Sequence, residues 1–137
     1  MKLPLYLIQE HAADKAGLHW DLRLQAIDNT GKQVLYSWAF PKGVPKKEGI
    51  KRLALRMPDH EMSWASFEGI IPKGEYGAGK VSIYDKGFYK PIKISRGKML
   101  FEIMGKKIKG VYCLTVMRGD DSKWFLEKQQ IIDQQED

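Results

Sequence analysis

Apolar and polar residues alternate in short runs along most of this chain of 137 residues. A period of two is typical of a strand that buries one face, and β-branched and aromatic residues favour the same conformation. The pattern predicts about eight strands, at residues 4–9, 18–27, 33–40, 52–57, 79–89, 98–105, 110–118 and 123–129. Segments rich in Gly, Pro, Asn and Asp lie between them and are predicted to be turns.

Short strands at this spacing are typical of an all-β fold, either a barrel or a sandwich. The chain shows no repeat, linker or change of composition along its length, so we expect residues 1–137 to form a single domain. The polar end of the sequence, residues 129–137, is predicted to be a frayed tail.

Charge narrows the class of partner. Lys and Arg number 23 against 17 for Asp and Glu, which gives a net charge of +6. This surplus favours a polyanionic partner, nucleic acid before membrane, although a merely solvated basic surface would look the same. The only cysteine is Cys113, which excludes an internal disulfide and favours a reducing compartment. No apolar run is long enough to span a bilayer and no signal peptide is evident, so we expect a cytoplasmic protein without a membrane partner.

Candidate chemistry begins in the segment "HAADKAGLHWDLRL", residues 11–24. On a strand, His19, Asp21 and Arg23 share one face, and the opposite face is wholly apolar and expected to meet the core. His11, at the end of the preceding strand, reaches the same surface if the residues between form a tight loop. Two imidazoles and one carboxylate are typical of a facial metal site, with Arg23 placed to neutralise an oxyanion.

A second group of basic residues follows downstream. Lys42 stands in "SWAFPKG", and Arg52 and His60 stand in "KRLALRMPDH". If these elements converge with the first group on one concave face of the sheet, cations surround the metal ligands. Such a site suits a phosphate, since the metal polarises one oxygen and the guanidinium groups offset charge on the others.

Several motifs together resemble the 3′-phosphoesterase domain of the bacterial ATP-dependent DNA ligase D. They are "QEHAADKAGLHWDLRL", "SWAFPKG", "KRLALRMPDHEMSWASFEGIIPKGEYGAGKVSIYDKG" and "KWFLEK", in the same order and over nearly the whole chain. The resemblance implies a small closed or nearly closed β barrel with a polar concave active site. It also implies a manganese-dependent hydrolase that acts in DNA repair by non-homologous end joining. Such an enzyme removes a 3′-terminal ribonucleoside from DNA to leave a 3′-phosphate, and then hydrolyses that phosphate.

The resemblance also assigns roles to residues and names partners. It makes His11, His19 and Asp21 the metal ligands. It makes Arg23, Arg52 and Lys42 the phosphate-binding cations, and His60 a proton donor or phosphate clamp. Gln9 and Trp64 belong to the substrate rim. The expected cofactor is Mn²⁺, with Zn²⁺ or another divalent ion as the alternative, because the ligands are nitrogen and oxygen. The expected partners are DNA 3′ ends and, in repair, a DNA ligase, a polymerase or an end-bridging protein.

The sequence departs from the family pattern in four places. Seven residues lie between the two histidines rather than five, Trp64 stands where tyrosine is typical, and Pro58 replaces a carboxylate. The resemblance also implies an N-terminal arm that the ligase-fused domain adds to its site, and we expect this chain to lack that arm. Indole offers an N–H donor but no hydroxyl, so a contact from tyrosine to phosphate is lost or reshaped. We therefore expect removal of the 3′-phosphate to be the weaker of the two hydrolytic steps.

Two other functions fit the same residues. Trp64 and the longer loop would suit a catalytically impaired module that binds DNA ends without cleaving them. The sequence "HWD" with a distant histidine also resembles the His-x-Asp…His iron site of β-barrel oxygenases. In that case His60 is the third ligand and His11 is idle.

Overall fold

The computed structural model describes residues 2–130, so most of the tail predicted at 129–137 lies outside the described residues. Within residues 2–130, one five-residue 3₁₀ helix, η1 (Met62–Ser66), accompanies strands joined by turns and loops. The strands are β1 (Leu5–Ala13), β2 (Gly17–Ile27), β3 (Gln33–Phe40), β4 (Lys51–His60), β5 (Gly69–Ile71), β6 (Gly79–Ser95), β7 (Lys98–Met104), β8 (Lys109–Met117) and β9 (Asp120–Lys128). No described helix has the length and apolar character needed to cross a membrane.

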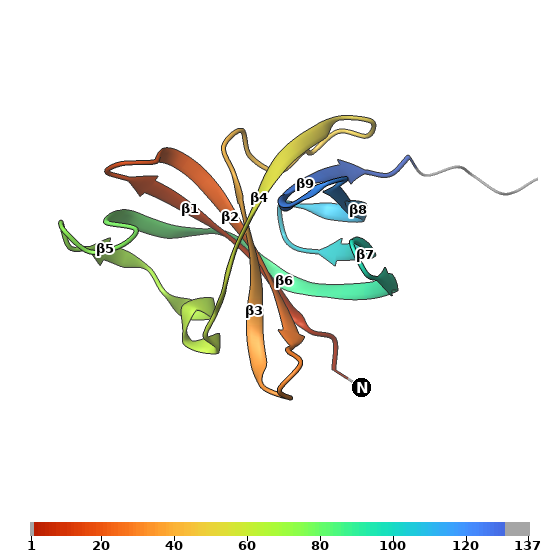
Figure 1. Ribbon diagram of the computed structural model, residues 1–137, viewed down its shortest axis with the longest axis horizontal. Coiled ribbons are helices and arrows are strands. Elements are labelled where there is room, and N and C mark those ends of the chain that lie inside the picture. Colours follow the sequence, from red (N-terminus) through yellow and green to blue (C-terminus); the bar gives the residue numbers. More distant parts are fainter. Residues whose placement is uncertain (1, 131–137) are drawn as a thin grey trace, which may run out of the picture.

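Eight of the strands close into an antiparallel barrel (Figure 1). The order around the ring is β1, β2, β3, β4, β9, β8, β7 and β6, and β6 pairs again with β1. The ninth strand, β5, pairs with the start of β6 outside the ring. The predicted all-β barrel of about eight strands is therefore confirmed. Neither β5 nor η1 was predicted, because three to five residues are too few to show a period.

The barrel interior is filled by side chains at alternate positions of each strand. On β2, Leu22 and Leu24 are fully buried, as the sequence predicted for this face. Leu18 on the same face is 52% exposed, because the β1–β2 hairpin extends past the end of the barrel. The remaining core positions include Tyr6, Ile8, Trp38, Phe40, Phe101, Tyr112 and Leu126. Burial of each large apolar side chain contributes about 1.5–3 kcal/mol, so this core holds the ring closed.

A second, smaller apolar cluster lies outside the ring. Leu7 of β1 and Leu35 of β3 point outward and are covered by Ala65 of η1. Met62 and Trp64 pack against the same cluster. The short helix therefore sits on the outer wall formed by β1, β2 and β3, and it shelters the polar residues next to it.

One end of the barrel is fastened by a buried carboxylate. Asp85 of β6 accepts hydrogen bonds from the Tyr6 hydroxyl at 2.9 Å and from three consecutive backbone N–H groups, those of Lys106, Lys107 and Ile108, at 3.0–3.1 Å. Burial opposes ionisation, but these donors outweigh it and lower the pKa of Asp85. Gly105 lies so close to this carboxylate that a Cβ there would stand 2.1 Å from Asp85 Oδ2.

Candidate metal centre

A row of polar side chains runs across the outer wall where β1, β2 and β3 pair. In the register of these strands, His11 lies opposite His19, and Gln9 lies opposite Asp21. Arg23 continues the row along β2. The covering helix and loop leave little of it accessible: Gln9 is 0% exposed, His11 8%, Asp21 5% and Arg23 4%. Buried polar groups of this kind need partners, so each contact in the row matters.

The longer spacing between the histidines lengthens the hairpin without disturbing its register. Residues 12–18 continue the β1–β2 ladder beyond the His11–His19 pair and turn at residues 14–16, with Gly17 at a φ of 78°. Two added residues supply one more cross-strand pair. Because side chains alternate with a period of two, an even insertion keeps both imidazoles on the same face.

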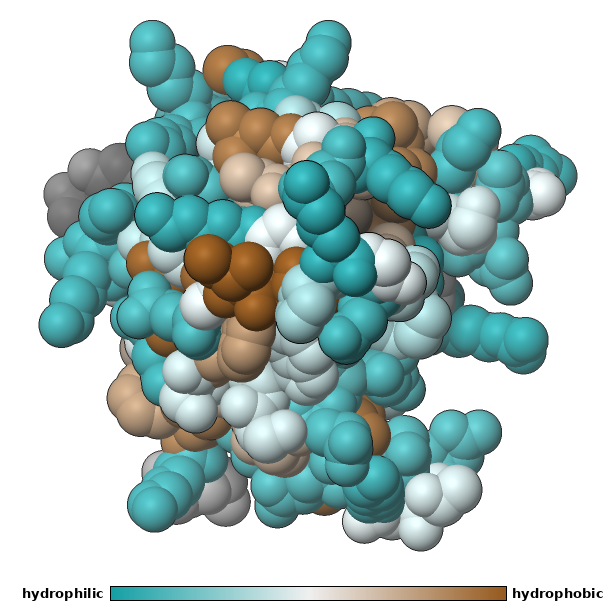
Figure 2. Space-filling model, turned by 90° about the vertical axis from the view of Figure 1, so that its left-hand side faces the viewer, coloured by the Kyte–Doolittle hydropathy of each residue, from teal (hydrophilic) through white to brown (hydrophobic). Residues whose placement is uncertain are grey.

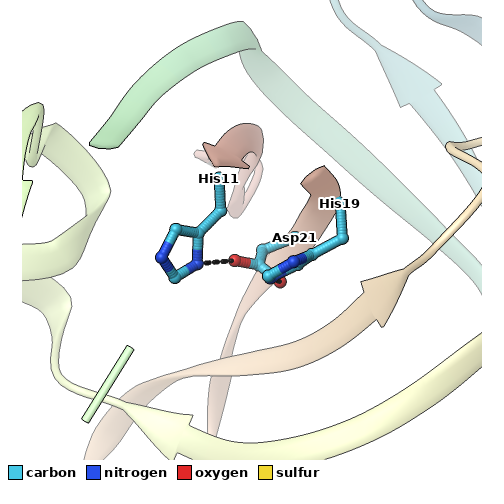
Figure 3. Close-up of side chains that lie close together, drawn as sticks. All are labelled: His11, His19 and Asp21. Atoms are coloured by element: carbon cyan, nitrogen blue, oxygen red, sulfur yellow. Dashed lines mark ion pairs between the residues drawn. The ribbon is translucent and has the colours of Figure 1, made fainter. Parts of the chain in front are cut away.

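His11, His19 and Asp21 point toward one another from the two strands (Figure 3). His11 Nδ1 lies 3.5 Å from Asp21 Oδ2, and His19 Nε2 lies 3.3 Å from Asp21 Oδ1. One ligand atom from each residue falls within 4.8 Å of the other two. The structure thus brings together the three residues that the sequence selected.

Backbone carbonyls hold the other nitrogen of each imidazole. His11 Nε2 donates to the Gly77 carbonyl at 2.7 Å, and His19 Nδ1 donates to the Gly17 carbonyl at 3.1 Å. A carbonyl oxygen accepts only, so these nitrogens carry the ring proton. In the neutral rings, the nitrogens that face Asp21 are then lone pairs. Three acceptors that face one another repel unless protons or a cation lie between them, and metal-binding histidines are typically oriented in this way.

The charges of the group are coupled. Burial disfavours the Asp21 carboxylate. It is outweighed by His11 and His19, which donate hydrogen bonds to Asp21 when their rings are protonated, and by the charge of Arg23, so that the pKa of Asp21 is held well below its usual range. The hydrogen bond with Asp21 raises the pKa of His19 despite partial burial. The three side chains therefore fit a divalent cation. They offer a carboxylate that stays ionised and two imidazoles, each with one nitrogen directed toward that carboxylate.

Arg23 lies beside the triad and is locked in place. Its Nε donates to Gln9 Oε1 at 2.5 Å and its Nη1 donates to Ser37 Oγ at 2.8 Å. The remaining Nη2 lies 3.6 Å from Asp21 Oδ2. Gln9 in turn donates to the carbonyls of Trp64 and Phe67 at 2.9 and 3.0 Å. Gln9 therefore joins the guanidinium to the covering helix instead of lying on an open rim.

His60 stands at the other side of Arg23. Its Nδ1 donates to the Pro58 carbonyl at 2.8 Å, its ring meets the Trp64 indole edge-on with centroids 5.4 Å apart, and Arg23 lies 5.7 Å over that indole. Burial first, and then the charge of Arg23, lower the pKa of His60. The metal-ligand group found among the described residues contains His11 and not His60, which counts against the iron-oxygenase alternative.

Lys42 and Arg52 do not join this group. Ala54, two residues after Arg52 on β4, is fully buried in the barrel core, so the alternation turns Arg52 inward as well. Both cations line a cavity at the mouth of the barrel that contains no member of the triad. The expectation that all the basic residues meet on one face is corrected here. Alternation shows which residues share a face, but it does not show which face meets the core.

The surface on the side of the hairpin tip and β5 is mainly hydrophilic, with apolar atoms near its centre and toward its upper edge (Figure 2). Among the described residues, Ile70 and Tyr76 are exposed large side chains of the adjoining segment. This face therefore offers polar and charged groups with a few apolar contacts. Such a surface suits a polar ligand better than a large apolar partner.

Comparison with known proteins identifies the family. The family model described as "DNA Ligase D 3'-phosphoesterase domain" matches residues 9–116, a span that includes every residue of the polar row. This chain belongs to the DNA ligase D 3′-phosphoesterase domain family.

Three relatives illustrate how far the likeness to this family extends. The multifunctional non-homologous end joining protein LigD of Pseudomonas aeruginosa is 41% identical over 130 residues, which cover 90% of this chain. The corresponding DNA repair protein of Mycobacterium tuberculosis is 39% identical over 127 residues, and that of Mycolicibacterium smegmatis is 38% identical over 125. The chain spans only 15–16% of the length of these relatives, so it corresponds to one part of each.

The structure adds site residues that the sequence analysis missed. Ser37 holds the Arg23 guanidinium, and the carbonyls of Gly77 and Gly17 orient the two histidines. Ser37 could have been noticed in the sequence, since it is a small polar residue in the middle of a mainly apolar strand. The two carbonyls could not have been found from the sequence, because every residue has a main-chain carbonyl.

Proposed function

We propose that this chain is a metal-dependent phosphoesterase that processes the 3′ ends of DNA during end joining. Its substrate is a DNA primer that ends in a ribonucleotide or a 3′-phosphate. It hydrolyses the phosphodiester next to a terminal ribonucleoside and releases that nucleoside. It then removes the remaining 3′-phosphate. Mn²⁺ is the proposed cofactor, and Zn²⁺ is the alternative that the same donor set allows.

The observation that carries this proposal is the orientation of the triad. Both imidazoles give their N–H to backbone carbonyls and turn their other nitrogen toward the Asp21 carboxylate. Arg23, a fixed cation, stands 3.6 Å from the same carboxylate. Membership of the 3′-phosphoesterase family supports a phosphate ester as the substrate of such a site.

The side chains divide the work between them. His11, His19 and Asp21 would hold the cation, which when bound supplies a Lewis acid for one phosphate oxygen. Arg23 is positioned through Gln9 and Ser37, so its guanidinium would meet charge that develops on the phosphate without reorganising.

His60 is proposed to clamp the phosphate and then supply a proton. In the free protein its pKa is lowered, so the ring is neutral at neutral pH. A phosphate anion beside it favours the imidazolium and reverses that shift. His60 would therefore take up a proton as substrate binds and donate it to the phosphate or to the leaving oxygen.

The test uses the purified chain and a primer–template whose primer ends in one ribonucleotide. With Mn²⁺ we expect a shortened primer that ends in a 3′-phosphate, followed by a slower appearance of the 3′-hydroxyl. His19→Ala should abolish both products and leave the thermal transition nearly unchanged, because His19 lies outside the barrel core. Lys90→Gln, an exposed change on β6, is the matched control and should keep full activity.

Two results would contradict the proposal. Tight binding of the primer without cleavage at any divalent ion would favour the DNA-end-binding module. Cleavage that survives His19→Ala would show that the triad is not the catalytic centre.

A further inference from the structure

A cavity of about 480 Å³ opens at the mouth of the barrel, on the inner side of the wall whose outer side carries the triad. Its volume falls in the range of small-molecule sites. Four cationic residues line it, Lys42, Lys46, Lys47 and Arg52, against a single acidic residue, Glu10. We call this space the mouth cavity.

The cations of the mouth cavity lack acidic partners. None of the four forms an ion pair with a carboxylate among residues 2–130, where the ion pairs of lysine and arginine involve other side chains. Arg52 Nε is buried without a hydrogen-bond partner in the same part of the chain, and Arg52 Nη1 reaches the Lys42 carbonyl only at 3.4 Å. A buried donor without a partner is costly, so this group of cations favours an anionic ligand.

Two aromatic side chains, Trp20 and Tyr84, line the mouth cavity. Tyr84 attracts two ammonium groups, with Lys46 Nζ 5.5 Å and Lys107 Nζ 4.3 Å from its ring centre. Gly43 stands against the Trp20 indole, where a Cβ would lie 3.6 Å from the ring. The absence of a side chain at Gly43 leaves room beside that indole. Two aromatic rings with cations beside them match a ligand that has both a planar face and negative charge.

The mouth cavity and the metal triad are separate. His19 and Trp20 are neighbours on β2, as are Glu10 and His11 on β1, and successive side chains of a strand point to opposite faces. The wall between them is therefore one sheet thick. A ligand in the mouth cavity cannot touch the triad through that wall.

We propose that the mouth cavity binds one unpaired nucleotide, with its base against the aromatic lining of Trp20 and Tyr84 and its phosphate among Lys46, Lys47 and Lys42. An inorganic anion would leave the aromatic walls unused, and an apolar ligand would leave the cations unneutralised. The nucleotide could be free or part of a single strand of DNA. The proposal does not depend on the metal chemistry of the outer wall.

The experiment is a titration of the ¹⁵N-labelled chain, followed by NMR, in EDTA so that no metal holds phosphate at the triad. The probes are deoxyadenosine monophosphate, deoxyadenosine, inorganic phosphate and a short oligothymidylate. We expect deoxyadenosine monophosphate to shift the Gly43 amide and the Trp20 indole N–H saturably, and more tightly than deoxyadenosine or phosphate does. A matching shift with the oligothymidylate assigns the site to a DNA strand, and a response to the mononucleotide alone assigns it to free nucleotide.

Variants distinguish nucleotide binding in the mouth cavity from non-specific attraction of an anion to a positively charged surface. Tyr84→Leu should weaken nucleotide binding at least about fivefold, since base–aromatic stacking contributes about 1–3 kcal/mol per base. Lys46→Gln with Lys47→Gln should weaken it as well, whereas Lys90→Gln with Lys98→Gln, at exposed positions outside the cavity lining, should not. Equal weakening by both lysine pairs, or shifts confined to the outer wall, would overturn the proposal.

Discussion

Two buried aspartates show how the same side chain can serve structure in one place and chemistry in another. Asp85 receives four hydrogen bonds at 2.9–3.1 Å, three of them from consecutive backbone N–H groups. Asp21 is as deeply buried, yet its nearest charged or ionisable groups stand at 3.3–3.6 Å. The carboxylate oxygens of Asp85 accept hydrogen bonds from the protein itself. Those of Asp21 remain available to protons or to a cation that lies between the side chains.

The partners explain the difference. A backbone N–H always donates, so the donors around Asp85 need no ligand to be compatible with its charge. The imidazoles around Asp21 donate their N–H groups to backbone carbonyls, so in their neutral form they face the carboxylate as acceptors. Asp85 therefore fastens the barrel without further help. The acceptors around Asp21 repel one another until protons or a cation lie between them.

The sharpest way to test this comparison is to neutralise each aspartate and measure Mn²⁺ binding by calorimetry. Asp21→Asn should weaken binding by at least about a thousandfold, because loss of a supporting partner alone costs about 10–100-fold and Asp21 is a proposed ligand. Asp85→Asn, in protein that remains folded, should bind Mn²⁺ as the parent does. Equal affinity in the parent and in Asp21→Asn would remove the metal site.

The free energy of unfolding in urea should instead depend on Asp85. Asp85→Asn should lower it by about 3 kcal/mol, since hydrogen bonds to a charged acceptor contribute about 1.5–3 kcal/mol each and an amide keeps only some of them. Asp121→Asn, at an exposed position, should leave stability unchanged. If both variants unfold at the same urea concentration, the fastening role of Asp85 is wrong.

The stability that Asp85 contributes should depend on pH in one direction. The pKa of Asp85 in the folded chain is lowered, so the contribution is fully present above the unfolded value of 3.8. It should be lost as the pH falls further, through the folded-state pKa. Urea unfolding of the parent and Asp85→Asn between pH 7 and pH 2 should therefore show curves that converge only at the acidic end. A constant gap would mean that the carboxylate charge is not what stabilises this end of the barrel.

Gln9 should give the smallest effect, because it touches neither the proposed cation nor the phosphate. Gln9→Leu removes the acceptor for Arg23 Nε and the donors for two carbonyls of the covering segment. We expect about a tenfold loss of phosphoesterase activity through misplacement of Arg23, with Mn²⁺ affinity retained. Gln9→Glu, which keeps the acceptor oxygens, should recover part of the activity. A loss of Mn²⁺ binding in Gln9→Leu would show instead that the change disturbs the wall as a whole.

Much of the candidate metal centre could be predicted from the sequence. His19, Asp21 and Arg23 share a face because they alternate with Leu22 and Leu24, which fill the core. His11 could be added because an antiparallel hairpin returns the chain beside itself. The seven residues between the histidines looked like a departure. The pairing shows that they lengthen the ladder by one pair and leave the parity unchanged.

The sequence by itself determined the strand pattern and which side chains share a face, because a period of two is a local property of the backbone. Only the tertiary structure decided what each face meets. Closure of β6 onto β1 made the Arg52 face of β4 the inside of a barrel and left the His19 face outside. That closure joins residues more than sixty positions apart, and it also brings the Gly77 carbonyl to His11. Contacts over such separations depend on how the whole ring packs, and no short stretch of sequence encodes them.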